Sequence, residues 1–564
     1  MAAETDITAT QWAAVIALFL MLLVPLAVAL AWWLKQRYAR AVVNLQSSSA
    51  GTKTPTAGTH LGAAPPPAVD VAAPPLGIQL IVAASVTADA DATLVPRRLR
   101  RRVLLVQFMT GLLYWIGLLL AVAVGLAIYN EATQSTEAVE AASPWAAVLT
   151  LVPMVFVPPL LAWALQTGAR EAIAWWIVVA GSIALAAGLA MSGQGLIAAL
   201  VVPLILTLLG LMLTAFLRPS VRGAGPPLVA AMIVAFLVFS AFSMIAVALD
   251  DGNSDESTWA EILTAIALLL AVSALSLWVG WRMLLRISRR YVHKRFSELQ
   301  LALGSYWGVL TLFILSAVML LAFEEKTGAA LEWVGLAVVI LWLVWRVTQR
   351  LALLWAVRRA APPRAPLLLL RVFKPSSRSE AFIDRFLARW RFAAPVWMIA
   401  GPDLAGALME PDEFFAYLRR KLADRFISDA AQIPEKIAAL DGGRDPDGRF
   451  RVSELFCANT TWQPTVLAMI ERAGGILLDL REYSTSRAGT RYELQELLRR
   501  APLERVLFLT DEAGDAPQLR AAIVEAWRAV GRRSGQTVRI VQLHDESDAE
   551  LDGLFRIAAG ADVT

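Results

Sequence analysis

The stretch LWLVWRVTQRLALLWAVRRAAPPRAPLLLLRVF, residues 341–373, divides the sequence into two parts of different composition. Before it, long apolar runs alternate with short charged loops, and after it the residues up to 564 have the composition of a soluble domain. The chain as a whole is 57% hydrophobic and only 17% charged, which is too apolar for a soluble enzyme of this length. The sequence therefore predicts a membrane domain followed by a water-exposed domain.

A helix needs a run of roughly 20 apolar residues to cross the hydrocarbon core of a bilayer. Nine runs meet this requirement. The last of them contains Arg346 and Arg350 close to one end, where long side chains can reach the interface. The predicted spans are residues 12–34, 103–129, 145–166, 173–191, 196–217, 226–249, 259–281, 303–323 and 331–350.

The charges in the loops predict the orientation of these spans. Basic residues gather in alternate loops, such as 97–102 and 282–290, whereas the loops between them, such as 250–256, are acidic or neutral. Positively charged loops stay in the cytoplasm. We therefore expect an integral protein of the bacterial inner (plasma) membrane, with the amino terminus outside and the carboxyl-terminal domain in the cytoplasm. Glu4 and Asp6 precede the first run, which is the reverse of the basic start of a cleavable signal peptide.

Several tryptophans, among them Trp145, Trp176 and Trp333, lie near the ends of predicted spans, which is typical of rings anchored at the headgroup level. No Asp, Glu, Lys or Arg lies at the centre of any predicted span. Ion channels and coupled transporters usually keep ionisable groups at that depth. We therefore expect the spans to form a scaffold, with transport of apolar molecules as an open alternative.

Composition divides the chain into four segments: a first transmembrane span (1–44), a flexible linker rich in Pro, Ala and Ser with a short apolar segment (45–96), an eight-span membrane domain (97–361) and a cytoplasmic domain (362–564). A linker of this composition cannot bury enough apolar surface to fold alone. Its apolar run Ile78–Val86 is too short to cross a membrane. A strand and an interfacial segment both remain open for that run.

Charge and cysteine usage restrict the partners. The net charge of +4 is too small to indicate nucleic acid, and its distribution indicates the lipid bilayer as the partner. With Cys457 as the one cysteine and three scattered histidines, we predict no metal site. The carboxylates within 441–448 lack EF-hand spacing and predict a solvated turn.

The second part alternates short apolar runs with amphipathic segments. Continuous apolar strands between helices are typical of a parallel sheet covered on both faces. The predicted fold is an α-helical membrane bundle followed by a doubly wound, flavodoxin-like α/β domain. We expect strands at 366–373, 395–400, 451–457, 475–480, 504–510 and 536–543, and helices at 379–391, 412–427, 463–473, 491–500, 516–531 and 548–559.

In such folds, ligands bind at the carboxyl ends of the strands. After the first strand, Ser376, Ser377 and Arg378 open a helix, where serine can cap backbone N–H groups and an anion can bind. The sequence contains neither a Walker lysine loop nor a GxGxxG motif, which argues against classical NTPases and dinucleotide dehydrogenases.

The order of strands and the segment STSRAGTRYEL, residues 484–494, resemble TIR and nucleoside deoxyribosyltransferase-like domains. The resemblance covers roughly residues 365–545, with 403–450 as an insert relative to a compact TIR unit. In the active members of both groups, a glutamate that opens this helix acts on an N-glycosidic bond, and Glu493 matches that position. The segments 460–480 and 489–498 also resemble a group of bacterial multi-span membrane proteins that share a Trp-Gln pair before a helix.

Such a site needs a carboxylate for ribose hydroxyls or for a developing oxocarbenium ion, and apolar walls around the base. Glu493 can supply the carboxylate. A second interpretation explains the same residues without a ligand, because Thr490 and Glu493 also have the spacing of a capping box. Trp462 is equally consistent with packing at the start of a helix. The ligand-binding candidates besides Glu493 are Phe373, Ser376, Ser377, Arg378, Trp462, Tyr483, Ser484 and Tyr492.

The sequence thus predicts a membrane-anchored cytoplasmic module for sensing or signalling. It would act through protein contacts, including a homo-oligomer, or through a ligand such as NAD or another nucleotide. The first alternative is an N-glycosidase or transferase that acts on NAD or nucleosides through Glu493. The second alternative is a membrane transporter.

Overall fold

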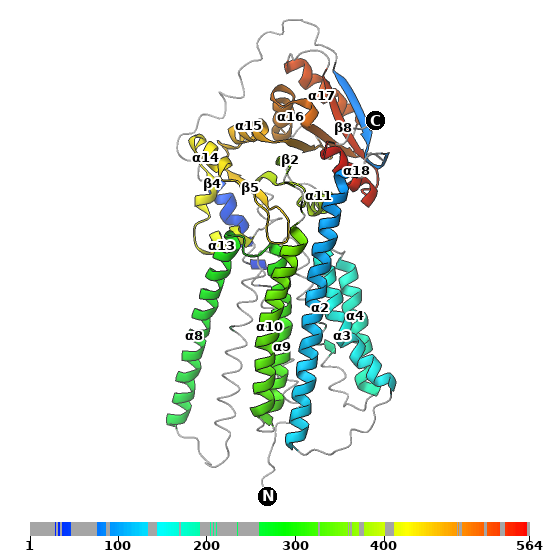
Figure 1. Ribbon diagram of the computed structural model, residues 1–564. Helices are drawn as coiled ribbons and strands as arrows, with labels where there is room; N and C mark the ends of the chain where they lie inside the picture. Colours follow the sequence, from blue (N-terminus) through cyan, green and yellow to red (C-terminus); the bar gives the residue numbers. More distant parts are fainter. Residues whose placement is uncertain are drawn as a thin grey trace. The chain divides into compact units, whose positions relative to one another are not determined.

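A computed structural model describes residues 29, 32–33, 36–46, 76–85, 91–133, 144–167, 171–191, 203–204, 207, 210, 234, 259–324, 328–358, 360, 362, 364–371, 377–400, 411–481, 483, 488–511, 516–530 and 536–560. The chain divides into two compact units (Figure 1). The helical unit comprises Met1–Gln36, Leu104–Trp355 and Leu408–Phe415. The α/β unit comprises Arg37–Val103, Ala356–Ala407 and Ala416–Thr564.

Long helices make up the described part of the helical unit. They are α2 (Asp91–Thr133), α3 (Pro144–Thr167), α4 (Glu171–Met191), α8 (Trp259–Val292), α9 (Glu298–Glu324) and α10 (Gly328–Val357). Among the described residues, five helical segments are long and apolar enough to cross a membrane: Pro96–Gly125, Pro144–Thr167, Ala172–Met191, Ile266–Val292 and Glu332–Val357.

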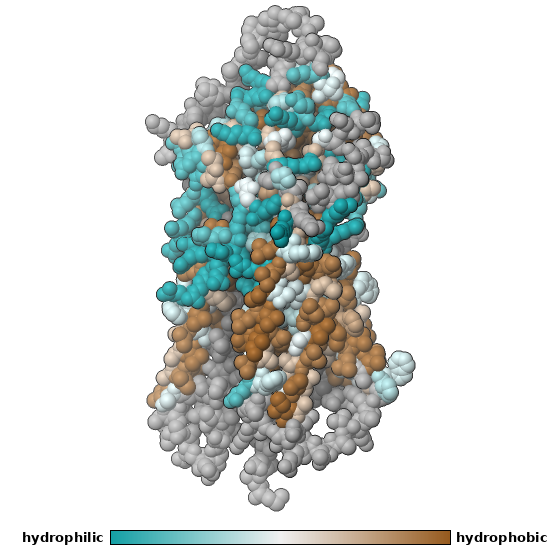
Figure 2. Space-filling model, viewed as in Figure 1, coloured by the Kyte–Doolittle hydropathy of each residue, from teal (hydrophilic) through white to brown (hydrophobic). Residues whose placement is uncertain are grey.

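These five segments overlap five of the nine predicted spans, which supports a membrane protein. The predicted span 303–323 lies within helix α9, which is not one of the five. The predicted spans 12–34, 196–217 and 226–249 fall almost entirely outside the described residues. The total of nine therefore stays a prediction. Figure 2 shows hydrophobic side chains on the visible surface of the long helices, as expected for helices that face lipid.

An aromatic cluster forms the core of the helical unit. Its buried members include Tyr114 and Trp115 on α2, Trp307 on α9 and Trp345 on α10. The Tyr114 ring centroid lies 6.2 Å from that of Trp307 and 5.6 Å from that of Trp345. Close packing requires Gly111, because a Cβ there would lie 2.8 Å from the Trp307 ring. The buried Trp115, Trp307 and Trp345 are therefore packing residues and not interfacial anchors. By contrast, Trp145, Trp176 and Trp333 are exposed, which is expected of rings anchored at the membrane interface.

Helix α3 contains three prolines and is nevertheless assigned as one continuous helix. Pro158 has no N–H to donate to the carbonyl oxygen of Met154, four residues earlier. The indole N–H of Trp115 donates to that oxygen at 3.2 Å. The Tyr306 hydroxyl donates to the Pro158 carbonyl oxygen at 2.6 Å. Neighbouring helices thus supply the hydrogen bonding that lets a membrane helix tolerate proline.

The α/β unit is built on one parallel sheet of eight strands. The strand order is β1-β8-β7-β6-β2-β3-β5-β4, and every neighbouring pair is parallel. The strands are β1 (Gly77–Val82), β2 (Leu367–Arg371), β3 (Val396–Ala400), β4 (Phe426–Ile427), β5 (Val452–Cys457), β6 (Gly475–Asp479), β7 (Val506–Asp511) and β8 (Thr537–Leu543). The helices that lie between and after strands β2 to β8 in sequence are α11 (Ser377–Trp390), α13 (Pro411–Leu418), α14 (Ile433–Ala438), α15 (Trp462–Arg472), α16 (Ala488–Arg500), α17 (Ala516–Val530) and α18 (Asp548–Ala558). The short 3-10 turns are η2 (Ala83–Ser85), η3 (Ala423–Arg425), η4 (Ala430–Gln432) and η5 (Leu503–Arg505).

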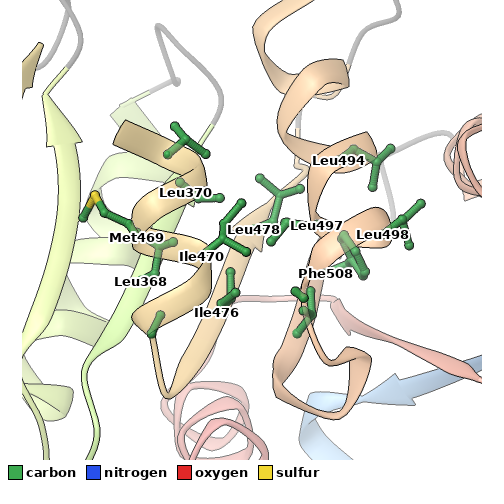
Figure 3. Packing of buried hydrophobic residues seen from close by; sticks show 14 of the residues in the cluster. Leu368, Leu370, Met469, Ile470, Ile476, Leu478, Leu494, Leu497, Leu498 and Phe508 are labelled. Carbon is green, nitrogen blue, oxygen red and sulfur yellow. The ribbon is translucent and has the colours of Figure 1, made fainter. Parts of the chain in front are cut away.

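Both faces of the sheet are covered. Successive side chains of a strand point to opposite faces. Leu368 and Leu370 pack with α15, α16 and α17 in one apolar cluster, part of which Figure 3 shows. The alternate residues Leu367 and Leu369 are just as buried, so the other face is covered as well. Burial on both faces explains why the strands read as continuous apolar runs.

The structure confirms a parallel α/β region and changes two details. The predicted helix 412–427 is wrong beyond Leu418, where helix α13 ends. Arg420 has a φ of 58°, and Lys421 N–H donates to the Ala416 carbonyl at 2.8 Å, which is the C-terminal turn of a Schellman motif. The apolar run at 78–86 also gains a definite structure, because Gly77–Val82 pairs with β8 as the edge strand β1.

Candidate functional site

The strand order reverses between β2 and β6, and open α/β sheets bind ligands at the carboxyl ends of the strands at such a reversal. From β2 the chain proceeds outward to β3, whereas from β6 it proceeds in the opposite direction to β7 and β8. Arg371 ends β2 and lies beside Asp479, which ends β6. A charged residue thus ends each of the two strands at the reversal.

A buried charge network surrounds Asp479. The Arg481 guanidinium donates to both carboxylate oxygens of Asp479, with Nε 2.9 Å from Oδ1 and Nη2 2.7 Å from Oδ2. Its Nη1 donates to Glu546 Oε1 at 2.8 Å, and Nη2 also donates to the Ser379 carbonyl oxygen at 3.2 Å. The guanidinium carbon lies 4.6 Å from the centroid of the Phe382 ring on α11.

All three guanidinium nitrogens of Arg481 donate hydrogen bonds within the protein. Burial alone would lower the pKa of Arg481, but the hydrogen bonds and negative charges of Asp479 and Glu546 outweigh burial and raise it. Because Arg481 is bidentate to Asp479 and stacked on a ring, we assign it a structural role. It ties the end of β6 to the start of α11 and to the segment before α18.

Arg371 behaves differently from Arg481. Its Nε and Nη2 atoms are buried, and neither has a hydrogen-bond partner in the described part of the chain. Both carboxylate oxygens of the neighbouring Asp479 accept hydrogen bonds from Arg481. Helix α11 starts at Ser377, six residues further on. A guanidinium near the start of a helix is suited to an anion.

Glu493 lies on the face of the sheet that α15, α16 and α17 cover. It belongs to the inner side of α16 together with Thr490, Leu494 and Leu497, all of which are buried. The Glu493 side chain is 4% exposed, and its Oε2 atom has no hydrogen-bond partner among the residues described. Burial raises the pKa of this carboxyl to about 8. Glu493 is therefore a neutral carboxylic acid at pH 7.

The capping-box interpretation of Thr490 and Glu493 is wrong. Helix α16 begins at Ala488, so Thr490 is its third residue and Glu493 its sixth. A capping residue would precede the helix. Within the described residues, the Thr490 hydroxyl also has no hydrogen-bond partner. Two buried polar residues thus lie one turn apart on the inner face of one helix, and the Thr490 hydroxyl and Glu493 Oε2 make no hydrogen bond to any described residue, although buried polar groups normally do.

Three predicted ligand-binding residues, Trp462, Tyr483 and Tyr492, lie in or beside the edge of the same apolar cluster. Trp462, the first residue of α15, contacts Tyr492 of α16 edge-to-face, with ring centroids 5.4 Å apart. Trp462 and Tyr483 both pack against the cluster and are half-buried. Burial raises the pKa of both tyrosines, so their hydroxyls are neutral at physiological pH. The structure brings Trp462 and Tyr492 together.

The remaining predicted site residues lie outside the described side chains. Phe373, Ser376 and Ser484 lie outside the described residues. Ser377 and Arg378 form the first turn of α11, and only their backbone is described. The proposed anion site at these residues therefore rests on the position of the helix.

Sequence reasoning missed Arg371, Asp479 and Arg481. Each lies at the end of an apolar strand, where a charged residue is a recognisable pattern. The partner Glu546, however, is distant in sequence. Its segment reaches the same edge of the sheet only because β6 pairs in parallel with β7 and β7 pairs in parallel with β8. The carboxylates at 441–448 were also misjudged. Asp445 and Asp447 are buried and bonded to Arg451 and Arg449, so they do not form a solvated turn.

Within the part of the chain that the structure describes, no group of three or more His, Cys, Asp and Glu side chains is arranged to hold a metal ion. No protein-family model matches this chain, and no curated protein matches it either. The resemblance to TIR and nucleoside deoxyribosyltransferase-like domains therefore stays a prediction from the residues quoted above.

Proposed function

We propose that this protein is a membrane-anchored module for sensing or signalling, with its α/β domain in the cytoplasm of a bacterial cell. In this proposal the domain is TIR-like and flavodoxin-like, and it acts through a nucleotide-like ligand or through protein contacts. The alternation of basic and acidic loops supports the orientation. The order β3-β2-β6-β7-β8 supports the fold, because it corresponds to the 2-1-3-4-5 order of flavodoxin-like sheets.

The observation that carries the proposal is the buried pair Thr490 and Glu493 on the inner face of α16. Among the described residues, the Thr490 hydroxyl and Glu493 Oε2 are without hydrogen-bond partners. Leaving such groups unpaired costs about 1–3 kcal/mol each. A ligand that offers hydroxyl and amide groups would remove this cost on binding. The half-buried rings of Trp462 and Tyr492 beside α16 are suited to the flat face of a base.

Titration calorimetry on the full chain in lipid nanodiscs tests this proposal, with NAD and adenosine as the probes. We expect at least one probe to bind, and Glu493→Gln to weaken that binding about tenfold or more, because a buried hydrogen bond to the ligand is lost. Glu496→Gln is the matched control. Glu496 lies one turn further along α16, and its carboxylate pairs with Arg500 at 2.7 Å.

The control variant should bind like the wild type. Binding that Glu493→Gln leaves unchanged would contradict a site at Glu493. Failure of the folded wild type to bind either probe would leave only the second form of the proposal, in which the domain contacts a protein partner or another copy. Cross-linking of the full chain in native membranes tests that form, and a purely monomeric product would overturn it.

The raised pKa of Glu493 favours a second candidate function, an N-glycosidase or transferase that acts on NAD or nucleosides. A carboxyl that is protonated at pH 7 can donate its proton to a departing base, as the general acid of a glycosidase does. Release of free base from NAD, lost in Glu493→Ala and kept in Glu496→Ala, would support this candidate. Absence of release by a protein that binds NAD would contradict it.

Transport remains the third candidate, and one observation favours it. Gln107 on α2 and Gln166 on α3 are buried in the bundle, and their amide atoms have no hydrogen-bond partners in the described residues. Polar groups inside a membrane bundle often mark a path for a substrate. The close packing of Gly111 against Trp307 opposes an open path. A solute flux in liposomes that Gln107→Leu abolishes would favour transport.

A further inference from the structure

The sheet is completed by a strand that precedes the membrane helices in sequence. Strand β1 pairs in parallel with β8 over six consecutive residue pairs, from Gly77 beside Thr537 to Val82 beside Gln542. All other strands follow helix α10. The helices from α2 to α10 are thus inserted between the first and second strands of one sheet. The start of α2 follows β1 and η2 directly along the chain.

The segment after β1 is locked against helix α18. Ala83 of η2 is fully buried, and its carbonyl group lies against Gly553. A Cβ on Gly553 would collide with that carbonyl group. The Ser85 hydroxyl donates to the Val82 carbonyl oxygen at 2.8 Å and closes the turn. Only glycine at position 553 allows this close approach.

Charged residues fix the start of α2 to the same helix. Arg97 of α2 forms an ion pair with Asp552 of α18. Arg389 of α11 donates to the same carboxylate at 3.2 Å. Two residues further along α2, Leu99 is buried beside Gly448, and Val357 at the end of α10 lies beside the same glycine. The α/β unit therefore holds the start of α2 and the end of α10 through its own residues.

Strand β1 is held less firmly than the central strands. It lies at the edge of the sheet and has β8 as its one neighbour. Leu80 is 42% exposed, and Gln79 is exposed as well, whereas four of the five residues of β2 are buried. Segments with few buried contacts open at lower free energy than the core of a domain. Strand β1 is therefore expected to open at lower free energy than the central strand β2.

We propose that the segments 77–85 and 91–103 form a releasable strap, which couples movement of the start of helix α2 to the edge of the sheet. In the docked state, β1 covers the edge of β8 and η2 holds α18. In the released state, the start of α2 separates from Asp552, and the edge of β8 becomes available for pairing. The strap does not depend on which ligand the domain binds, so its failure and that of the proposed function are distinguishable.

Hydrogen exchange of the full chain in lipid nanodiscs tests the strap with the variant Gly553→Ala. We expect exchange in 77–85 and in 91–103 to become about tenfold faster or more, because the new methyl group displaces η2. Protection of β2 and β6 should stay unchanged. Gly442→Ala is the matched control, since a Cβ at Gly442 meets nothing within 4 Å. It should leave exchange in every segment unchanged.

Asp552→Asn is a milder second variant, because it removes the charge that pairs with Arg97 and Arg389 without adding bulk. We expect it to speed exchange in the same two ranges by a smaller factor. Loss of protection throughout the sheet in both variants would overturn the proposal, because the strap would then be an inseparable part of the core. Unchanged exchange at 77–103 in both variants would overturn it as well.

Discussion

At the residue scale, Glu493 is the group with the most unusual environment in the α/β unit. Its side chain is buried in an apolar cluster, and desolvation disfavours its charged form. Carboxyl groups with strongly raised pKa values are concentrated at functional sites. The neutral acid can donate a hydrogen bond, which an ionised carboxylate cannot do.

The raised pKa of Glu493 predicts how stability depends on pH. The pKa rises from 4.5 to about 8 on folding, so between these values the folded state holds a proton that the unfolded state has lost. The free energy of unfolding should then fall as pH rises through this range, with about 1.4 kcal/mol for each unit of pKa shift. Glu493→Gln should remove this contribution.

Thermal unfolding of the full chain in detergent at pH 5 and pH 8 measures the effect. The difference in melting temperature between Glu493→Gln and the wild type should be larger at pH 8, in favour of the variant. The same difference at both pH values would show that Glu493 has an ordinary pKa.

Cys457 provides a second prediction at this scale. Its thiol is buried at the end of β5, and burial raises its pKa to about 11. The reactive thiolate is therefore nearly absent at neutral pH. Maleimide should label the native protein very slowly and the denatured protein rapidly. Ser428 is exposed, so Ser428→Cys in a Cys457→Ser background should label rapidly in the native state. Fast labelling of native Cys457 would contradict its burial.

At the element scale, helix α3 depends on hydrogen bonds from its neighbours. Trp115→Phe removes the indole N–H that bonds to the Met154 carbonyl oxygen and should destabilise the bundle by about 1 kcal/mol beyond the loss of packing. Trp345→Phe is the matched control, because the buried Trp345 indole N–H has no hydrogen-bond partner in the described residues. Thermal unfolding in detergent compares the two. Equal destabilisation would contradict a contribution from the bond.

Element types in the α/β unit follow from sequence pattern, because apolar strands and amphipathic helices alternate there. Strand β6 and helix α17 were predicted within one residue of their bounds. Helix α13 was predicted too long, since its apolar periodicity continues past Leu418 and nothing in the sequence marks Arg420 as left-handed. Arginine rarely adopts that conformation. The turn is closed by backbone hydrogen bonds from Arg420 to Tyr417 and from Lys421 to Ala416, which the pattern of side chains does not reveal.

At the scale of the whole molecule, the separation into an apolar and a soluble part was predictable from composition alone. The contribution of β1 to the sheet was not. A six-residue apolar run within a Pro- and Ala-rich segment has no neighbours in sequence that reveal its partner. The pairing with β8 joins residues separated by the membrane helices, so only the folded chain defines it. The same holds for the candidate site. Glu493 was predicted from a sequence motif, whereas Arg371 was recognised only from its pairing with Asp479 across strands β2 and β6.

The composite sheet predicts how a truncated domain behaves. The fragment 362–564 lacks β1 and leaves the edge of β8 unpaired, and unpaired edges promote aggregation. We expect this fragment to aggregate on size-exclusion chromatography. The same fragment with residues 76–85 fused to its start through a flexible linker should be monomeric and melt at a higher temperature. Equal behaviour of the two would contradict a stabilising role for β1.

Sensing requires that a ligand at α16 changes the segment that leads into the membrane helices. Hydrogen exchange of the full chain in nanodiscs, with and without saturating NAD or adenosine, measures both ends of this path at once. We predict slower exchange in 488–500 together with altered exchange in 77–103, and neither change in Glu493→Gln. Identical exchange in both segments with and without each probe, in a protein whose β2 and β6 remain protected, would contradict a nucleotide-sensing role.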